Sequence, residues 1–235
     1  MTHKYILTHK DMEPVEGYEI LDNRNNTELD HRIWSELAGM QLLFNRIMNE
    51  KNENGMATFN DNDFISLSHY RRRIDPDCTN RFYIPQPIMF QESLASQYAQ
   101  CHNIEDLQLC GQALKEEFPH LVQLFEQVLN GNIFIPYNIA ILSVSQFKDY
   151  CNFLFKVLDN LHKKIGTETY EDRLDYIKRY PEKYTGKNKN NDPVYQARIE
   201  AFCSERLSTF YWLYVSKQIP VFPAKVNLLE KGQKI

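Results

Sequence analysis

The sequence has no apolar run that approaches the roughly 18 residues a membrane-spanning helix needs. Its first ten residues hold only a short apolar and aromatic core, without the pattern of a signal peptide. These two absences exclude an integral membrane protein and disfavour a secreted one. We therefore expect a cytoplasmic protein.

The sequence also has no Cys-x-x-Cys pair, no internal repeat and no low-complexity tract. Its five cysteines are odd in number and widely spread, at Cys78, Cys101, Cys110, Cys151 and Cys203. In a reducing compartment this pattern indicates free, buried thiols. The net charge of −4 disfavours a broad nucleic-acid footprint, so we expect no nucleic-acid partner, and any site for a polyanion must be local.

Length and composition are those of a soluble globular domain, with 235 residues, 43% hydrophobic and 25% charged. No shift in composition marks a boundary, so we predict a single domain over 1–235. Residues 166–192 are charged and contain Lys-Asn-Lys-Asn-Asn-Asp, which predicts a mobile loop. Residues 216–235 follow the last expected helix and are predicted to form a tail.

Hydrophobic periodicity predicts strands alternating with helices. Strand-like segments are 5–8, 64–68, 81–87, 133–136 and 139–142; helical segments are 31–49, 93–101, 104–118, 120–129, 146–163 and 194–215; residues 12–29 are polar and irregular. This order predicts an α/β fold of three layers, with a mostly parallel sheet flanked by helices.

The most informative stretch is 63–73, Asp-Phe-Ile-Ser-Leu-Ser-His-Tyr-Arg-Arg-Arg. It reads as a buried strand that ends in a histidine, a tyrosine and three arginines. In open α/β sheets, ligands bind beyond the carboxyl ends of strands. A guanidinium group is always charged and can bind two oxygens at once. The stretch therefore predicts the diphosphate end of a nucleotide-sugar site.

The three arginines also allow a more ordinary interpretation. On an extended backbone Arg71 and Arg73 point one way and Arg72 the other, so part of the run can form structural ion pairs with Asp75 or Asp77. Many sugar transferases hold a divalent metal with Asp-x-Asp after a strand. Here the pair lies several residues past the strand and encloses a proline. We expect no metal, and Asp75 with Asp77 is the fallback site for Mn or Mg.

Two further segments hold candidate residues. Thr8, His9 and Lys10 follow the first strand, where a loop often meets the base or ribose of a nucleotide, although an exposed loop is the alternative. Glu36 lies off the apolar stripe of the first helix, which is typical of a solvated residue or a helix ion pair. Gly39 within that helix costs about 1 kcal/mol relative to alanine, so something should approach the backbone there.

The last helix carries a polar stripe. Arg198, Phe202 and Glu205 recur at helical spacing, and Arg206 lies beside them. A carboxylate among arginines is more often structural than catalytic. Asn138 stands at an expected turn between strands, where asparagine is also common for local reasons.

Taken together, these fragments resemble a bacterial glycosyltransferase domain family of capsule, O-antigen and exopolysaccharide synthesis, long known only as a domain of unknown function and marked by a His-Tyr-Arg-Arg signature. The matching blocks are Thr8-His9-Lys10, Ser35-Glu36-Leu37, His69-Tyr70-Arg71-Arg72, Gln97-Tyr98 with His102 and Asp106, Asn138 with residues 147–155, and Arg198 with residues 201–207. Ala38 and Ala201 depart from the family pattern.

The resemblance implies a GT-A-like fold and transfer of a sugar from a nucleotide-diphosphate sugar to a bacterial surface polysaccharide, such as capsule, O-antigen or lipooligosaccharide. The acceptor would be an oligosaccharide or a lipid-linked glycan, with possible peripheral contact at the inner membrane face. We expect these roles: Thr8, His9, Lys10, Arg71 and Arg72 bind the nucleotide diphosphate; Glu36, Glu205 and His69 are catalytic; Asn138, Arg198 and Arg206 contact the sugar or support such contacts.

Two alternatives stay open at this stage. One is a nucleotide-sugar or glycan binding module without catalysis, and the other is a phosphotransferase that acts on surface glycans. Both would use the same arginines. The sequence does not identify the donor sugar, the base, the acceptor, the stereochemical outcome or the oligomeric state.

Overall fold

A computed structural model describes residues 1–51, 58–76, 80–186 and 188–228. Its centre is a sheet in which β1 (Thr2–Thr8) lies between β2 (Glu19–Asp22) and β3 (Phe64–His69), parallel to both. The ladder of β1 against β3 is the longest in the sheet. The later residues of both strands are buried without alternation, as expected for parallel strands covered on both faces.

The remaining strands extend this sheet on the far side of β3. The first, β8 (Ala140–Ser143), runs antiparallel to β3 and to β5 (Tyr83–Pro85). A hairpin joins β3 to β4 (Arg72–Ile74), which pairs with β10 (Val226–Leu228), and β9 (Phe222–Ala224) adds to β5 in parallel. The segment predicted as a tail therefore supplies two strands of the sheet.

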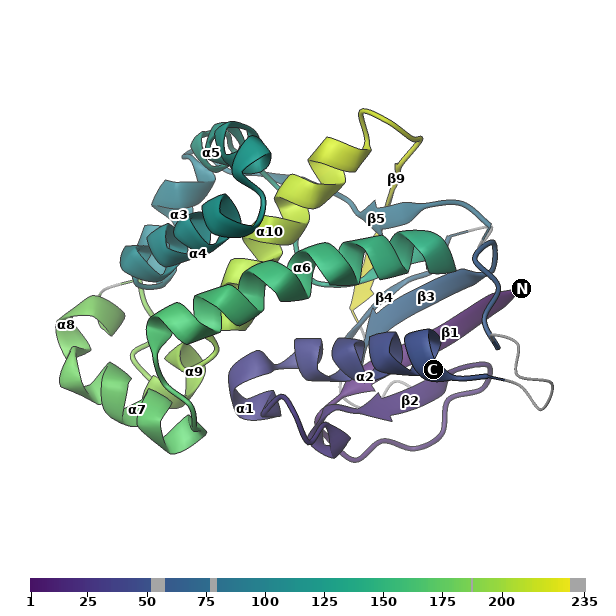
Figure 1. The fold of residues 1–235 in the computed structure, drawn as a ribbon, viewed down its shortest axis with the longest axis horizontal. Coiled ribbons are helices and arrows are strands. Elements are labelled where there is room, and N and C mark those ends of the chain that lie inside the picture. Colours follow the sequence, from purple (N-terminus) through teal and green to yellow (C-terminus); the bar gives the residue numbers. More distant parts are fainter. Residues whose placement is uncertain (52–57, 77–79, 187, 229–235) are drawn as a thin grey trace.

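Two helices, α2 (Glu36–Asn49) and α6 (Val144–Ile165), lie across one face of the sheet (Figure 1). A capping box of Ser143 and Gln146 starts α6, and Gly166 in the left-handed conformation ends it. The apolar stripe of α6 packs on the strands in the main core. A smaller cluster of Ile74, Ile139 and Ile141 covers part of the opposite face.

A further group of helices packs together outside the sheet (Figure 1). They are α3 (Leu94–Cys101), α4 (Ile104–Glu117), the short η2 (Pro119–Leu121), α5 (Val122–Asn130) and α10 (Ile199–Val215), beside the two-stranded pair β6 (Ile88–Met89) and β7 (Ile133–Phe134). The predicted α/β class, with a mainly parallel sheet flanked by helices, is confirmed. None of the helices in the described ranges is long and apolar enough to cross a membrane.

Backbone breaks divide two helices that periodicity had joined. The helix predicted over 31–49 is interrupted at Ser35, whose φ of 53° separates α1 (His31–Trp34) from α2. The last predicted helix is divided into α9 (Pro193–Gln196) and α10. The segment 12–29 is not wholly irregular, because it forms β2 and the short helix η1 (Asn23–Asn25). Apolar spacing carries no information about such breaks.

The loop predicted over 166–192 is wrong for much of its length. It contains α7 (Tyr170–Arg179) and α8 (Pro181–Tyr184). Thr169 and Asp172 form a capping box at the start of α7. The charged composition was misleading because Arg173 is fully buried and paired with Glu200 on α10.

The expectation of free thiols is confirmed for the described cysteines. Cys110, Cys151 and Cys203 are buried and unbridged, and Cys101 is half-buried. Cys78 lies outside the described residues.

Candidate functional site

A polar hollow opens beyond the carboxyl ends of β1 and β3, where an α/β sheet binds its ligands. It brings together residues from both ends of the chain. Its lining comprises His9, Ser35, Glu36, His69, Arg71, Arg72, Tyr137, Asn138, Ile139, Tyr195, Arg198, Ala201, Phe202 and Glu205. Most of the site residues predicted from the sequence therefore share one cavity, which we call the inner compartment.

The hairpin from β3 to β4 places two arginines on the same side. Tyr70 and Arg71 form its turn, and Arg72 pairs with His69 across it. The prediction that Arg71 and Arg72 point in opposite directions is wrong, because the backbone is not extended at the turn. Both line the inner compartment, whereas Arg73 donates from Nε to Asp75 at 2.7 Å. The run thus divides into two arginines that line the cavity and one that forms an ion pair with Asp75.

The cationic groups of the compartment lack carboxylate partners. Across the residues that the structure describes, no ion pair involves Arg71, Arg72 or Arg198. The Nε of Arg72 is buried without a hydrogen-bond acceptor, and its guanidinium lies 4.1 Å from the centre of the Tyr137 ring. Buried donors normally find acceptors. This unsatisfied positive charge suits an anionic ligand.

Glu36 faces the compartment, so its interpretation as a solvated helix residue is wrong. It is the first residue of α2, directly after the unusual backbone of Ser35. Its Oε1 accepts a hydrogen bond from Asn138 Nδ2 at 2.8 Å. Burial raises the pKa of Glu36, whereas a positive charge on nearby His69 and hydrogen bonds from the Ser35 hydroxyl, the Glu36 amide and Asn138 lower it, and the net direction is downward. The hydrogen bonds favour the ionised carboxylate.

Glu205, from the middle of α10, has a raised pKa, in contrast to Glu36. Burial raises its pKa, Arg206 opposes this, and the charge of Glu36 adds to the rise. Its Oε1 accepts from the Tyr137 amide at 3.1 Å. Two carboxylates in one cavity thus have pKa values moved in opposite directions, which is a common mark of divided acid–base roles.

The histidines of the compartment are neutral. Burial lowers the pKa of His69 to about 4, and Arg72 and Arg71 act in the same direction while Glu36 opposes them. The Arg71 amide donates to His69 Nδ1 at 3.4 Å, which leaves the proton on Nε2. Burial, with Lys10 and other cations, also lowers the pKa of His9. His69 can therefore act as a neutral hydrogen-bond donor.

Three predicted residues lie next to the compartment without lining it. Thr8 Oγ1 bonds both the amide and the carbonyl of Lys10 at 3.0 Å, which shapes the loop after β1. The Lys10 amine lies 5.3 Å from the centre of the Tyr70 ring. Arg206 is buried and donates to Gln97 and to Glu205, so it holds Glu205 in place.

Of the fallback metal pair Asp75 and Asp77, only Asp75 lies among the described residues. Asp75 is occupied by Arg73 and accepts from Asn227 Nδ2 at 3.1 Å, and Asp77 lies outside the described residues. Within the described ranges, no group of three or more His, Cys, Asp or Glu side chains is arranged to hold a metal ion.

The lining residues that sequence reasoning did not assign to the site are Ser35, Tyr137, Ile139, Tyr195, Ala201 and Phe202. The positive φ of Ser35 has no sequence signal, since serine rarely adopts it. Tyr195 lies 4.5 Å from the Arg198 guanidinium, and Phe202 lies 5.5 Å from it, so both rings orient this arginine. The spacing of three residues between Tyr195 and Arg198 hints at their contact only once the short α9 is known.

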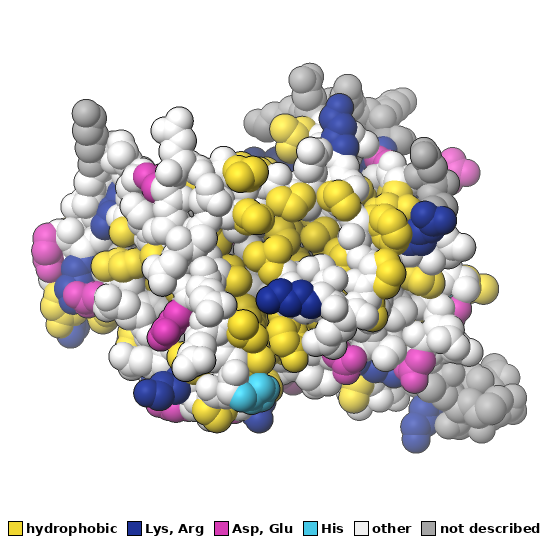
Figure 2. Space-filling view, turned by 90° about the horizontal axis from the view of Figure 1, so that it is seen from above, with side chains coloured by type: hydrophobic (Ala, Val, Ile, Leu, Met, Phe, Trp, Pro, Cys, Tyr) yellow, Lys and Arg dark blue, Asp and Glu magenta, His cyan; other side chains and the backbone are white. Residues whose placement is uncertain are grey.

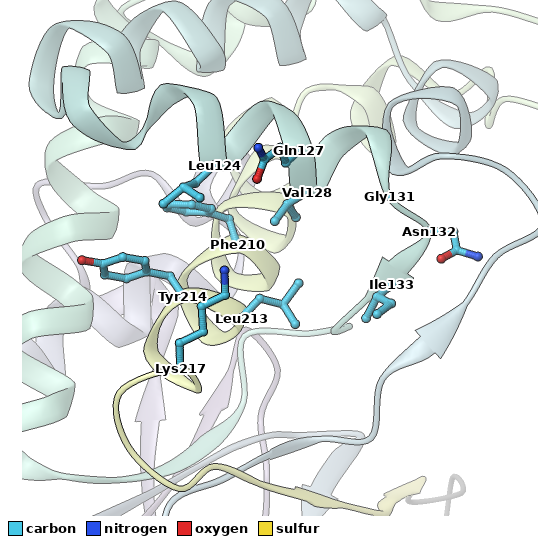
Figure 3. A pocket seen from close by; sticks show the side chains of 10 residues that line it. All are labelled: Leu124, Gln127, Val128, Gly131, Asn132, Ile133, Phe210, Leu213, Tyr214 and Lys217. Carbon is cyan, nitrogen blue, oxygen red and sulfur yellow. The ribbon is translucent and has the colours of Figure 1, made fainter.

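A separate apolar groove lies between α5 and α10. Figure 2 shows hydrophobic side chains gathered on this face, and Figure 3 shows the groove itself, with Leu124, Val128, Phe210 and Leu213 among its walls. Lys217 is its one charged lining side chain within the described residues. Among its lining residues there is no carboxylate or histidine for acid–base chemistry.

Comparison with known proteins supports the fold. A family model described as a domain of unknown function, DUF4422, matches residues 77–181, which excludes the arginine signature. No curated protein sequence matches the chain. The structure of WbbM, a bifunctional glycosyltransferase solved in its apo form, is similar with a TM-score of 0.65 at 13% identity. The likeness covers 97% of this chain but only 45% of the WbbM chain. The chain therefore shares its fold with the matching part of WbbM.

Proposed function

We propose that this protein is a glycosyltransferase that moves a sugar from a nucleotide-diphosphate sugar to a glycan. The observation that carries the proposal is the pair Arg71 and Arg72, which face a cavity without carboxylate partners while two carboxylates of unlike pKa line the same cavity. The fold that the chain shares with WbbM, a bifunctional glycosyltransferase, supports this chemistry.

The arginines would stabilise the leaving group. As the bond between the anomeric carbon and the diphosphate oxygen breaks, negative charge grows on the phosphate oxygens. Cations already aimed at that position lower the barrier without reorganising. Each guanidinium can bind two of these oxygens, and neutral His69 can donate a further hydrogen bond. Thr8, His9 and Lys10 would shape the nucleotide side of the same site.

The two carboxylates would divide the remaining work. As the acceptor oxygen bonds to the anomeric carbon, its proton must leave. Glu205 has the raised pKa, so it is the stronger base of the two and would take that proton. Glu36 stays ionised and would stabilise positive charge on the sugar ring. Asn138 would hold Glu36, Arg206 would hold Glu205, and Arg198 would contact a substrate.

The acceptor and the cellular location are proposed from the sequence motifs that resemble the glycosyltransferase family. We propose that the acceptor is a bacterial surface polysaccharide, either an oligosaccharide or a lipid-linked glycan. We also propose that the protein is cytoplasmic, with peripheral contact at the inner membrane face. Residues 1–235 would act as one domain. The reaction would not depend on a metal ion, because Arg71 and Arg72 would supply the charge that a metal supplies elsewhere.

Nucleotide binding tests the proposal most directly. In a panel of UDP, GDP, CDP and ADP, at least one should raise the melting temperature of the wild type. Arg71→Ala and Arg72→Ala should each weaken its Kd roughly 10-fold to 100-fold, since charge-assisted hydrogen bonds contribute about 1.5–3 kcal/mol. Arg73→Ala is the matched control and should leave Kd within twofold. An equal loss in all three variants, or no binding to the wild type, would refute the proposal.

Product analysis separates the alternatives. A transferase should slowly release nucleoside diphosphate from a nucleotide sugar even without an acceptor, and Glu205→Gln should lower transfer while leaving nucleotide Kd unchanged. A binding module would release nothing. A phosphotransferase would release nucleoside monophosphate.

A further inference from the structure

A second hollow adjoins the inner compartment. The two share His9, Ser35, Tyr195 and Arg198 as lining residues, so they lie side by side. The second hollow has a volume of about 360 Å³, within the range of small-molecule sites, about 300–1,000 Å³. Its own walls include His31, Arg32, Tyr170, Asn190, Asp192 and Val194, and we call it the outer compartment.

Arg32, the arginine that lines the outer compartment and not the inner one, is paired with carboxylates of the protein. Arg32 donates to Asp30 from Nε at 3.0 Å and from Nη2 at 2.6 Å, and its Nη1 bonds Glu171 at 3.2 Å. Asp192 caps α9 by accepting from the Val194 amide at 3.0 Å. Apart from Arg198 at the shared wall, this hollow therefore presents no unpaired arginine to a ligand. A neutral ligand suits it better than a polyanion does.

The aromatic residues there leave little room for a stacked base. Tyr170 is only 8% exposed, and the Arg32 guanidinium lies 4.2 Å from the centre of its ring. Tyr195 is packed against Phe202, with 5.1 Å between ring centres, and against Arg198. A nucleobase needs an open ring face to stack on. Here an arginine already lies against each ring, and Phe202 also packs against Tyr195.

Such walls suit a carbohydrate. Sugar hydroxyls need several hydrogen-bonding groups, and the C–H faces of the ring need some apolar surface. Val194 is 53% exposed and supplies such surface next to the polar residues. We infer that the outer compartment binds the terminal sugar of the acceptor glycan, with Arg198 and His9 at the boundary between acceptor and donor. This inference rests on the proposed function, because it divides one cleft between the two substrates.

The test blocks the outer compartment alone. In Val194→Trp a bulky ring replaces an exposed residue that lines the outer compartment and not the inner one. Asp175→Trp is the matched control, because Asp175 is exposed on α7 and lines neither compartment. The probes are the methyl pyranosides of glucose, galactose, mannose and N-acetylglucosamine, detected by saturation-transfer NMR in the presence of the nucleoside diphosphate that binds best. The Kd of that nucleotide is measured on the same proteins.

We expect a signal from at least one glycoside with the wild type and with Asp175→Trp, and a loss of at least fivefold with Val194→Trp. The nucleotide Kd should stay within twofold in all three proteins. If Val194→Trp melts more than 5 °C below the wild type, His31→Ala replaces it, with an expected loss of at least threefold.

Other results overturn the inference. A nucleotide Kd weakened more than fivefold by the blocking variant would place the nucleoside in the outer compartment. A retained glycoside signal, or no signal with a wild type that binds nucleotide, would show that the acceptor binds elsewhere. A wild type that binds no nucleotide overturns the proposed function as well, so the two failures are distinguishable.

Discussion

Removal of Glu200 should destabilise the protein severely. Arg173 on α7 and Glu200 on α10 are both 0% exposed and form two hydrogen bonds, Nη1 to Oε2 at 2.8 Å and Nη2 to Oε1 at 2.6 Å. His162 Nδ1 lies 2.7 Å from the same carboxylate. In Glu200→Ala the guanidinium keeps only neutral partners: Thr167 Oγ1, the Ala197 carbonyl and, at 3.4 Å, His162 Nδ1.

The expected cost follows from that uncompensated charge. Breaking a buried pair by removing one partner typically costs about 3–5 kcal/mol. A domain has only about 5–15 kcal/mol of stability in total. Burial raises and Arg173 lowers the pKa of Glu200, and the net direction is downward, so the carboxylate is ionised and the pair is a true ion pair. The loss should also loosen α7, which carries Tyr170 of the outer compartment.

Urea unfolding monitored by circular dichroism measures the effect. The control is Glu116→Ala, which removes a carboxylate bonded to Lys164 on the surface and should barely move the midpoint. The double variant Arg173→Met with Glu200→Leu should recover at least half of the loss, because no charge is then left alone. A cost below about 1 kcal/mol for Glu200→Ala would refute the reasoning.

Three further predictions concern packing, pH and metal. Gly39→Ala should cost about 1–3 kcal/mol in urea unfolding despite the better helix propensity, because the new Cβ would clash with Asn23 Oδ1, and Asn23 is buried and held by its hydrogen bond to the Ser35 carbonyl; a stabilised variant contradicts this. The pKa of His102 is lowered to about 3 and that of Asp106 raised to about 7, both mainly by burial. Between pH 4 and 6.5, His102 is protonated in the unfolded state but largely neutral in the folded state, so its titration makes the free energy of unfolding rise with pH. Asp106 is protonated in the folded state up to about pH 7 but ionised in the unfolded state, so its titration makes the free energy of unfolding fall with pH. In Asp106→Asn the free energy of unfolding should therefore rise more steeply from pH 4 to 7 than in the wild type. The same pH dependence in both proteins would contradict this prediction. Transfer should persist in excess chelator, and a loss restored by manganese would move the site to residues 75–77.

Much of the fold was readable from local sequence. The strand at 64–68 and the helices at 104–118 and 146–163 were predicted within a few residues, because apolar spacing is a local signal. Composition misled at 166–192, where Arg173 appeared solvated but pairs with a residue on another helix. A charge pattern does not reveal a partner that is distant in the chain.

The candidate site was likewise predictable from the sequence in part. The sequence by itself determined the chemistry that is available, a run of arginines after a strand and carboxylates on two helices, because side-chain type and local order are written in it. Only the tertiary structure decided which arginines face the cavity and that Glu36 meets Glu205 there. The turn at residues 70–71 and the backbone of Ser35 set those directions. The pKa values follow from burial and neighbours, which exist only after distant segments have packed together.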